Sequence, residues 1–217
     1  MKNVVAIVPI KLKNTRLPGK NTKILDGKPL LSYILKNLNE SQRISRIVVC
    51  CSDMGLKNYL PEYVDFLHRP TELDQDDANF TEIFSFIQEQ IMADIFVYAH
   101  ATAPFISTAS IDKCIMAVAE EGFDSAFSAK KFQDYLWSSA FTPVNFDPSL
   151  VPRSQDLPVL FRETSGIYAF TNDLFVENKR RIGTNPKAIE VDWIEAIDIN
   201  EQEDFDLATL ITTKAGK

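Results

Sequence analysis

A cluster of cations lies near the start of the chain, between Lys11 and Lys28. The segment carries six lysines and arginines and one acid, Asp26, in a protein whose formal net charge is −7. It follows an apolar, β-branched run, residues 4–8, of the kind that forms buried strands. Open α/β sheets bind ligands beside the carboxyl ends of such strands, and Pro18-Gly19 supplies a turn where backbone can approach a ligand closely. The spacing predicts a polyphosphate cradle, although a lysine-rich loop is also compatible with plain solvated surface.

A second pair of residues that could do chemistry lies near the other end of the chain. Asp198 and Asn200 are spaced i and i+2, so on a strand their side chains would face the same side. The pair offers a carboxylate and a neutral amide oxygen. An Asp-x-Asn pair at a strand end is unspecific by itself, and a structural role is the commoner one.

Two further polar segments follow predicted strands. Ser52-Asp53 follows the strand expected over residues 46–51, and His100 to Pro104 follows the strand expected over residues 94–99. The carboxyl ends of successive parallel strands converge on one edge of a sheet. We therefore expect the basic loop, these two segments and the region around Asp198 to meet at one ligand site. Each is weak alone, because a Ser-Asp after a strand is more often a helix cap.

Alternating strand and helix patterns position these segments. Pro29 is predicted as the first residue of a helix, and Asn79 with Glu82 three residues on is predicted to start another. Further helices are expected over about 108–121, before Gly122, and about 203–211. The alternation implies βαβ units with right-handed crossovers, and hence an α/β fold with a mostly parallel central sheet flanked by helices. The expected strands cover residues 4–8, 46–51, 65–67, 94–99, 124–129, 166–170 and 188–191.

The alternation breaks between Phe132 and Leu160. This stretch holds four prolines and two aromatic clusters, within residues 135–137 and 141–146. It is predicted to be an excursion from the sheet rather than a second domain. The expected organisation is therefore one domain over residues 1–217 with an insertion at 132–160. Exposed aromatic side chains there would form an apolar patch.

The composition is that of an ordinary globular protein. Hydrophobic residues make up 45% and charged residues 24% of 217 residues, enough for one α/β domain with a sizeable core. We expect no signal peptide and no transmembrane helix, since no apolar run reaches about 18 residues. The three cysteines fall in apolar segments without zinc spacing, which favours buried thiols in a reducing, cytoplasmic compartment. A sequence pI near 4.9 argues against nucleic acid as the main partner.

The basic loop carries a resemblance to a known family. The run from Pro9 to Asn21, followed by the Gly-Lys-Pro-Leu of residues 27–30, resembles the signature loop of the acylneuraminate cytidylyltransferases. Lys20, Asn21 and residues 27–30 match the family pattern directly. Lys11 stands where the family usually has arginine, which keeps the charge but loses the bidentate fork. The resemblance implies a single-domain, Rossmann-like nucleotidyltransferase fold and CTP as donor, with Pro9, Lys11 and Asn21 at the nucleotide.

Two more segments resemble the nucleotide-binding parts of that family. The run from Arg69 to Asp76 resembles the segment bordering the cytosine and ribose pocket, which would make both residues nucleotide ligands. A turn with a structural Arg–Glu pair is an equally good interpretation. Thr102 and Pro104 match the next family segment and place Thr102 at the nucleotide. His100 replaces a glutamine of this segment, and Ile106 an arginine. His100 can still donate a hydrogen bond to the substrate, and a satisfied structural histidine is an equally good interpretation; no acid–base work is assigned to it.

The resemblance continues through the second half of the chain. Residues 153–158 and 161–168 resemble the region that holds the acidic sugar, which makes Arg153, Gln155 and Arg162 candidate substrate ligands. Arginine suits a carboxylate because its planar fork binds both oxygens. Salt bridges across a subunit interface are a compatible alternative for the two arginines. In relatives the excursion at 132–160 makes a dimer contact, so a homodimer is expected.

The last matching segment surrounds Asp198. In the family two aspartates at this spacing hold Mg²⁺, and here Asp198 keeps the first while Asn200 replaces the second. The resemblance thus implies Mg²⁺ as cofactor, with Asp198 and Asn200 as metal ligands, since one or two carboxylates with substrate phosphates and waters suffice. The implied reaction joins CMP from CTP to the anomeric hydroxyl of an acidic α-keto sugar and releases pyrophosphate. Lys11, Arg16, Lys20 and Asp198 are the candidate catalytic residues.

Two other functions remain open from the sequence. Many transferases of this architecture use UTP or GTP with a neutral sugar phosphate, so the fold alone would not identify the substrates. The substitutions at His100, Ile106 and Asn200 also suit a catalytically silent nucleotide- or sugar-binding homologue. The ordered set of matching segments, from Val4 to Leu210, favours the cytidylyltransferase.

Overall fold

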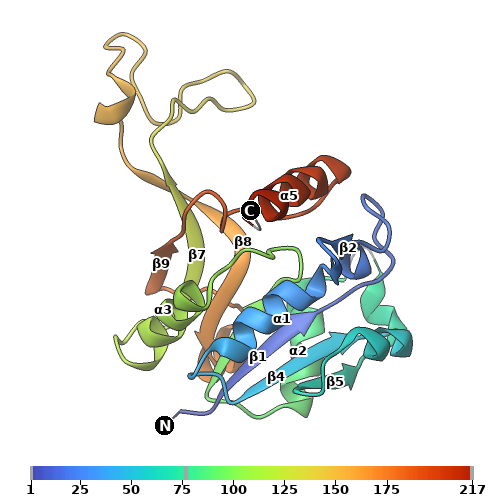
Figure 1. The fold of residues 1–217 in the computed structure, drawn as a ribbon. Helices are drawn as coiled ribbons and strands as arrows, with labels where there is room; N and C mark the ends of the chain where they lie inside the picture. Colours follow the sequence, from blue (N-terminus) through green and yellow to red (C-terminus); the bar gives the residue numbers. More distant parts are fainter. Residues whose placement is uncertain (1, 76–77, 216–217) are drawn as a thin grey trace.

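A seven-stranded sheet forms the centre of the protein, in a computed structural model that describes residues 2–75 and 78–215 (Figure 1). The strand order is β5-β4-β1-β6-β8-β7-β9. Four of the six pairings are parallel, and β8 runs antiparallel to both of its neighbours. The strands are β1 (Val4–Pro9), β4 (Arg46–Cys51), β5 (Val64–His68), β6 (Ile95–Ala99), β7 (Ser125–Phe132), β8 (Leu160–Thr171) and β9 (Pro186–Glu190). The mostly parallel α/β sheet predicted from the sequence is confirmed.

Helices cover both faces of this sheet because β1 is apolar on both of its own faces. Val4, Ala6 and Val8 pack in one buried cluster with α1 and α3, whereas Val5 and Ile7 pack in a second with α2 and α4. This alternation follows from the two-residue period of a strand. The helices are α1 (Leu31–Glu40), α2 (Phe80–Gln90), α3 (Thr108–Ala119), α4 (Asn172–Asn178) and α5 (Gln202–Ala215). Within the described ranges, no helix combines the length and the apolar character that a membrane span needs.

The starts of two helices were predicted from local sequence, and one of the two predictions is confirmed. Asn79 and Glu82 form the predicted capping box, in which each side chain accepts a hydrogen bond from the other residue's backbone N–H. The prediction for Pro29 is wrong: Pro29 pairs with Ile24 in a small hairpin of β2 (Ile24–Leu25) and β3 (Lys28–Pro29), and α1 begins at Leu31. The Asp26-Gly27 turn, with positive φ at both residues, makes this hairpin possible. The short helix α4 was not predicted.

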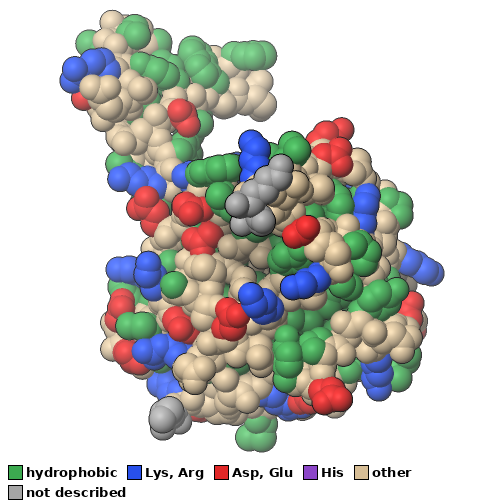
Figure 2. All heavy atoms as spheres, in the orientation of Figure 1, with side chains coloured by type: hydrophobic (Ala, Val, Ile, Leu, Met, Phe, Trp, Pro, Cys, Tyr) green, Lys and Arg blue, Asp and Glu red, His purple; other side chains and the backbone are tan. Residues whose placement is uncertain are grey.

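Residues 133–159 leave the sheet between β7 and β8 as a protruding arm (Figure 1). Inside the arm, Tyr135 and Trp137 each pack edge-on against Phe146, and an isolated bridge joins Trp137 to Pro143. Figure 2 shows hydrophobic side chains spread over its surface. The most exposed of them are Phe141 at 84% and Leu150 at 77%. The arm has little apolar interior of its own.

Candidate functional site

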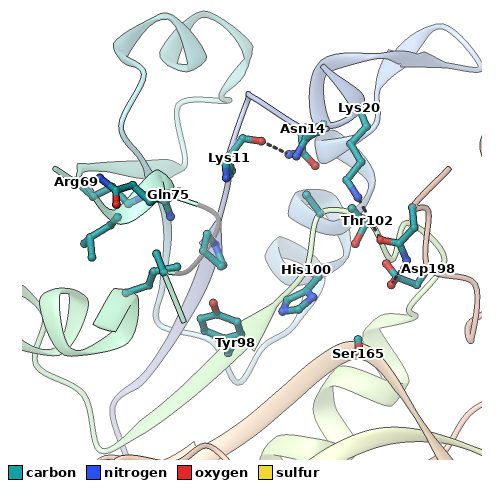
Figure 3. A pocket seen from close by; sticks show the side chains of 17 residues that line it. Lys11, Asn14, Lys20, Arg69, Gln75, Tyr98, His100, Thr102, Ser165 and Asp198 are labelled. Carbon is teal, nitrogen blue, oxygen red and sulfur yellow. Dashed lines mark hydrogen bonds between the residues drawn. The ribbon is translucent and has the colours of Figure 1, made fainter. Parts of the chain in front are cut away.

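A pocket opens at the carboxyl ends of β1, β5 and β6, and the expected Ser52-Asp53 segment does not line it (Figure 3). Its volume is about 460 Å³. Segments far apart in the sequence supply its walls: the loop after β1, the turn after β5, the loop after β6, a bend in β8 and the segment before α5. The predicted residues that line it are Pro9, Lys11, Lys20, Asn21, Arg69, His100, Thr102, Asp198 and Asn200.

The loop after β1 owes its shape to Gly19 and Asn21. Gly19 has φ of 64°, a left-handed conformation that glycine adopts without strain, and it starts a short 3-10 turn over Lys20–Thr22. The buried Asn21 side chain donates a hydrogen bond to the carbonyl of Lys11, with Nδ2 and O 3.0 Å apart. Asn21 therefore holds the loop in the conformation that carries Lys11 and Lys20 to the pocket.

Lys20 joins the two ends of the chain. Its Nζ donates to the carbonyl of Ile199 at 3.0 Å, and the N–H of Ile199 donates to the carbonyl of Thr102 at 2.8 Å. The backbone of one residue, Ile199, thus links the basic loop, the loop after β6 and the segment before α5. Burial lowers the pKa of Lys20, while the charge of Asp198 acts in the opposite direction. Lys20 and Asp198 share one site, as the predicted mechanism requires.

Asn200 bonds to cations through its oxygen. Its Oδ1 accepts from Arg16 at 2.7 Å and from Lys20 at 3.4 Å, and its Nδ2 donates to Oδ2 of Asp198 at 2.7 Å. The side chain is therefore a bridge between two cations and a carboxylate. In this arrangement its oxygen is not directed to a metal beside Asp198, in contrast to the ligand role expected from the sequence. Arg16 does not line the pocket itself but reaches Asn200 at its rim.

Asp198 retains an oxygen that could bind a metal. Its Oδ1 is buried, and among the described residues it has no hydrogen-bond partner. A buried carboxylate oxygen without a partner is costly unless a ligand completes it. In residues 2–75 and 78–215, no three His, Cys, Asp or Glu side chains gather as a metal cluster. The residues present thus fit Mg²⁺ held by Asp198 together with substrate phosphates and waters, which is a usual way of binding this ion.

Arg69 has a structural role in the pocket wall. The side chain is 2% exposed, and its Nη2 lies 2.5 Å from Oδ1 of Asp74 and 3.2 Å from the carbonyl of Ile10. Asp74 also accepts from Ser52. The ion pair predicted as the alternative to nucleotide contact exists, with Asp74 rather than Glu72 as partner. Arg69 therefore ties the turn after β5 to the end of β1. Asp76, the other predicted ligand of this segment, lies outside the described residues.

His100 is a neutral ring in the pocket wall. Burial lowers its pKa to about 4, and the charge of Arg181 acts in the same direction. The ring lies near Tyr98 and Tyr168, with centroids 5.4 and 6.1 Å away. A neutral imidazole can donate or accept one hydrogen bond to a ligand. The structure therefore agrees with hydrogen bonding rather than with acid–base work.

The three predicted sugar ligands are split between two places. Arg162 lines a second cavity of about 480 Å³, which shares Ser165, Asp198 and Asn200 with the first. Arg153 and Gln155 lie on the arm and line neither cavity. The Arg153 side chain is 73% exposed and pairs with Asp156, 2.7 Å from Nε to Oδ2. Within one chain, Arg162 belongs to the site, and Arg153 and Gln155 do not.

Several pocket residues were missed by the sequence analysis. Asn14 has a buried Oδ1 that finds no partner among the described residues, and Tyr98 and Ser165 also line the pocket. Asn14 sits inside the cation cluster, so its position was visible in the sequence although its role was not. Arg181 lies behind the pocket, 3.7 Å from the ring centre of Tyr168. Nothing in its surrounding sequence indicates that position.

Comparisons with known proteins agree with this geometry. Residues 5–209 match the model of a family described as cytidylyltransferase. The chain is similar to the N-acylneuraminate cytidylyltransferase of Oncorhynchus mykiss, at 23% identity over 78% of this chain and 41% of that protein. It is also similar to the CMP-N,N'-diacetyllegionaminic acid synthase of Legionella pneumophila, at 25% identity over 94% of each.

The fold is similar to a solved structure of CMP:2-keto-3-deoxy-manno-octonic acid synthetase complexed with CTP. The TM-score is 0.74 with 13% identity, over 98% of this chain and 99% of that one. At this identity the likeness concerns the fold alone. The chain spans about half the length of three curated relatives that it matches, 41%, 50% and 53%.

Proposed function

Because the chain belongs to the cytidylyltransferase family, we propose that it transfers CMP from CTP to the anomeric hydroxyl of an acidic α-keto sugar and releases pyrophosphate. One observation carries this proposal. Lys20, from the basic loop, and Asp198, from the far end of the chain, line the same pocket and are bridged by Asn200. A clustered positive field beside a carboxylate with an open oxygen suits a triphosphate and its cation.

The proposed reaction is a displacement at the α-phosphorus of CTP. The acceptor oxygen forms a bond to that phosphorus, the bond to the bridging oxygen of pyrophosphate breaks, and the acceptor hydroxyl gives its proton to solvent water. Negative charge grows on the pyrophosphate as it leaves. Catalysis of this kind depends on positioning and charge neutralisation. Lys20 and Lys11 are proposed to neutralise the phosphate oxygens, with Arg16 at the rim.

Mg²⁺ is proposed as the cofactor, with Asp198 as its protein ligand. When bound, it would supply charge neutralisation on the phosphates and lower the pKa of the attacking hydroxyl. Support comes from the buried Oδ1 of Asp198, which has no partner among the described residues. Asn200 is proposed to keep Asp198 oriented through the 2.7 Å bond to its Oδ2. Among the described residues, no side chain identifies itself as a general base.

The acceptor is proposed to occupy the second cavity. This cavity shares Asp198 and Asn200 with the first, so a ligand in each would meet beside Asp198. Arg162 lies there as a candidate partner for the acceptor carboxylate. The names of the similar proteins, which activate acylneuraminate and legionaminic acid, support an acidic sugar.

We also propose that the arm binds a second copy of the chain. Its large apolar side chains are exposed, and a second copy would cover them. In such a dimer the exposed Arg153 and Gln155 would be available to the partner.

A direct assay tests the proposal. The purified protein is incubated with Mg²⁺, each of the four ribonucleoside triphosphates, and a panel of nonulosonic acids, 3-deoxy-manno-octulosonate and sugar phosphates, and pyrophosphate is measured. We expect release only with CTP and a keto acid. Asp198→Ala should abolish it, whereas Asp173→Ala, on α4 and away from both cavities, should not. Release with UTP or GTP and a sugar phosphate, or with no combination at all, would overturn the proposal.

A further inference from the structure

Ser165 has a backbone conformation that a serine rarely adopts. Its φ is 56°, in the left-handed region, which costs a residue with a Cβ atom on the order of 1 kcal/mol. It is also one of three residues that line both cavities of the site, with Asp198 and Asn200. In Figure 3, Ser165 lies on β8, below His100 and Asp198. Strain of this kind at the junction of two ligand cavities indicates a functional constraint.

A large bulge in β8 produces this conformation. Phe127 of β7 pairs with Tyr168, but Ala129 pairs with Glu163. One β7 residue, Ser128, therefore stands opposite the four β8 residues 164–167. Bulges bend a strand and re-aim side chains, and they are common beside active sites. Here the extra residues carry Ser165 toward the two cavities.

Ser128 and Ile106 hold the bulge in place. The Ser128 hydroxyl is buried and accepts from Oγ1 of Thr164 at 2.7 Å and from the N–H of Ile167 at 3.1 Å. Gly166 packs so closely that a Cβ atom there would lie 2.9 Å from Cγ1 of Ile106. Both ends of the bulge are thus fixed. Ser165 cannot relax to negative φ without breaking these contacts.

The Ser165 hydroxyl donates a hydrogen bond to the Tyr168 hydroxyl, which leaves the Ser165 oxygen as an acceptor for a ligand. Burial raises the pKa of Tyr168 to about 12, the hydrogen bond to Glu163 adds to that rise, and the hydroxyl of Ser165 lowers it. Glycine would fit the left-handed φ without strain. The presence of serine there thus adds a hydroxyl group to the junction at a cost in stability.

We propose that Ser165 is a specificity-determining residue, whose hydroxyl hydrogen-bonds a polar group of the acceptor where the two cavities meet. The inference rests on the proposed function, because it assigns the acceptor rather than the nucleotide to this hydroxyl. It concerns the neutral hydroxyl or amide groups of the acceptor, whereas Arg162 is the candidate for its carboxylate.

Two substitutions separate the hydroxyl from the strain. Ser165→Ala removes the hydroxyl and keeps the strained Cβ, whereas Ser165→Gly removes both. We expect the KM for the best acceptor of the panel to rise about tenfold in both variants, as for a lost hydrogen bond of about 1.4 kcal/mol, with kcat and the KM for CTP within twofold of wild type. Ser165→Gly should melt about 2 °C above Ser165→Ala, because only alanine keeps the left-handed strain.

Lys179→Gly is the matched control. Lys179 also has φ of 56°, but it ends α4 and lines neither cavity. Its replacement should relieve strain without changing either KM. An acceptor KM within twofold of wild type in Ser165→Ala would overturn the inference, as would equal melting temperatures for the two Ser165 variants. If the wild-type protein releases no pyrophosphate with any acid, the proposed function itself has failed, which is a different result.

Discussion

The pocket at the sheet edge and the arm between β7 and β8 differ in how their polar side chains are held. In the pocket, Lys20 and Arg16 bond to groups about 180 positions away in the sequence. In the arm, Arg153 pairs with Asp156 three positions on, and the large apolar side chains face outward. The described pocket residues are therefore held by bonds between distant parts of one chain, whereas the arm exposes large apolar side chains.

This difference separates two kinds of function. The pocket depends on the whole fold, because its walls come from both ends of the chain. The arm is attached through two strands only and contributes nothing to the walls of either cavity. Substitutions in the pocket should alter catalysis and leave the association of two copies intact. Substitutions in the arm should weaken that association.

After the abolished activity expected of Asp198→Ala, the largest expected effect is that of Lys20→Ala. Lys20 Nζ lies at the centre of the bonds to Ile199 and Asn200, and its loss removes a preorganised charge from the phosphate site. We expect kcat for pyrophosphate release to fall at least ~100-fold. Lys36→Ala, at an exposed position on α1 that pairs with Glu40, should leave kcat unchanged. Near-normal turnover in Lys20→Ala would contradict the phosphate-binding role.

The arm is tested by association. Phe141→Ser with Leu150→Ser should weaken dimerisation at least ~30-fold, because both side chains are far more exposed than core residues and are available to a partner. Sedimentation velocity measures this over a concentration series. Met92→Ser, which removes a side chain 91% exposed elsewhere on the surface, serves as the control. A wild-type protein that is monomeric at micromolar concentration would refute the dimer proposal.

Asn200→Asp should sharpen the metal dependence of the pocket. The variant loses the N–H that Asn200 donates to Asp198, so two carboxylates would repel each other unless a cation lies between them. We expect about tenfold tighter Mn²⁺ or Mg²⁺ binding by calorimetry, and a larger rise in melting temperature on adding Mg²⁺. Asn39→Asp, an exposed change on α1, controls for net charge. An unchanged metal titration would mean that position 200 has no access to the metal.

The smallest expected effect concerns pH. The folded-state pKa of His100 is lowered to about 4, so between pH 6.5 and 4 the unfolded chain binds more protons than the folded one at this residue. The contribution of His100 to the free energy of unfolding is thus fully present above pH 6.5 and is lost as the pH falls toward 4. His100→Gln should lose about 2 kcal/mol less than wild type between pH 7 and pH 5 in urea unfolding. Parallel losses in the two proteins would show that His100 does not contribute.

Much of the fold follows from local sequence, because its signals are local. The capping box at Asn79 and the apolar run at residues 4–8 predict α2 and β1 from the order of neighbouring residues alone. The prediction for Pro29 was wrong because its fixed φ suits a helix start and a turn equally well. The pairing with Ile24 places Pro29 in the hairpin. The short helix α4 has too few residues for a recognisable period.

The site was predictable in position and less so in detail. The convergence of Lys20 and Asp198 follows from the convergence of strand ends. The bond from Asn200 to two cations does not, since it depends on side-chain directions across 180 residues. In the same way, the sequence groups Arg153 with Arg162 as candidate sugar ligands. Only the path of the arm shows that Arg153 lines neither cavity. The turn after β5 brings Asp74, and not Glu72, to Arg69, and the sequence alone does not show which of the two acids is the partner.

The backbone bonds of Ile199 determine at which stage of synthesis the basic loop can reach its final conformation. Its N–H is bonded to Thr102 and its carbonyl to Lys20, so the binding loop receives its last constraint from a segment made long after it. A chain emerging from the ribosome would have β1, β4 and β6 well before it had this clasp. A nascent chain should therefore lack this constraint on Lys20 until synthesis has passed residue 200.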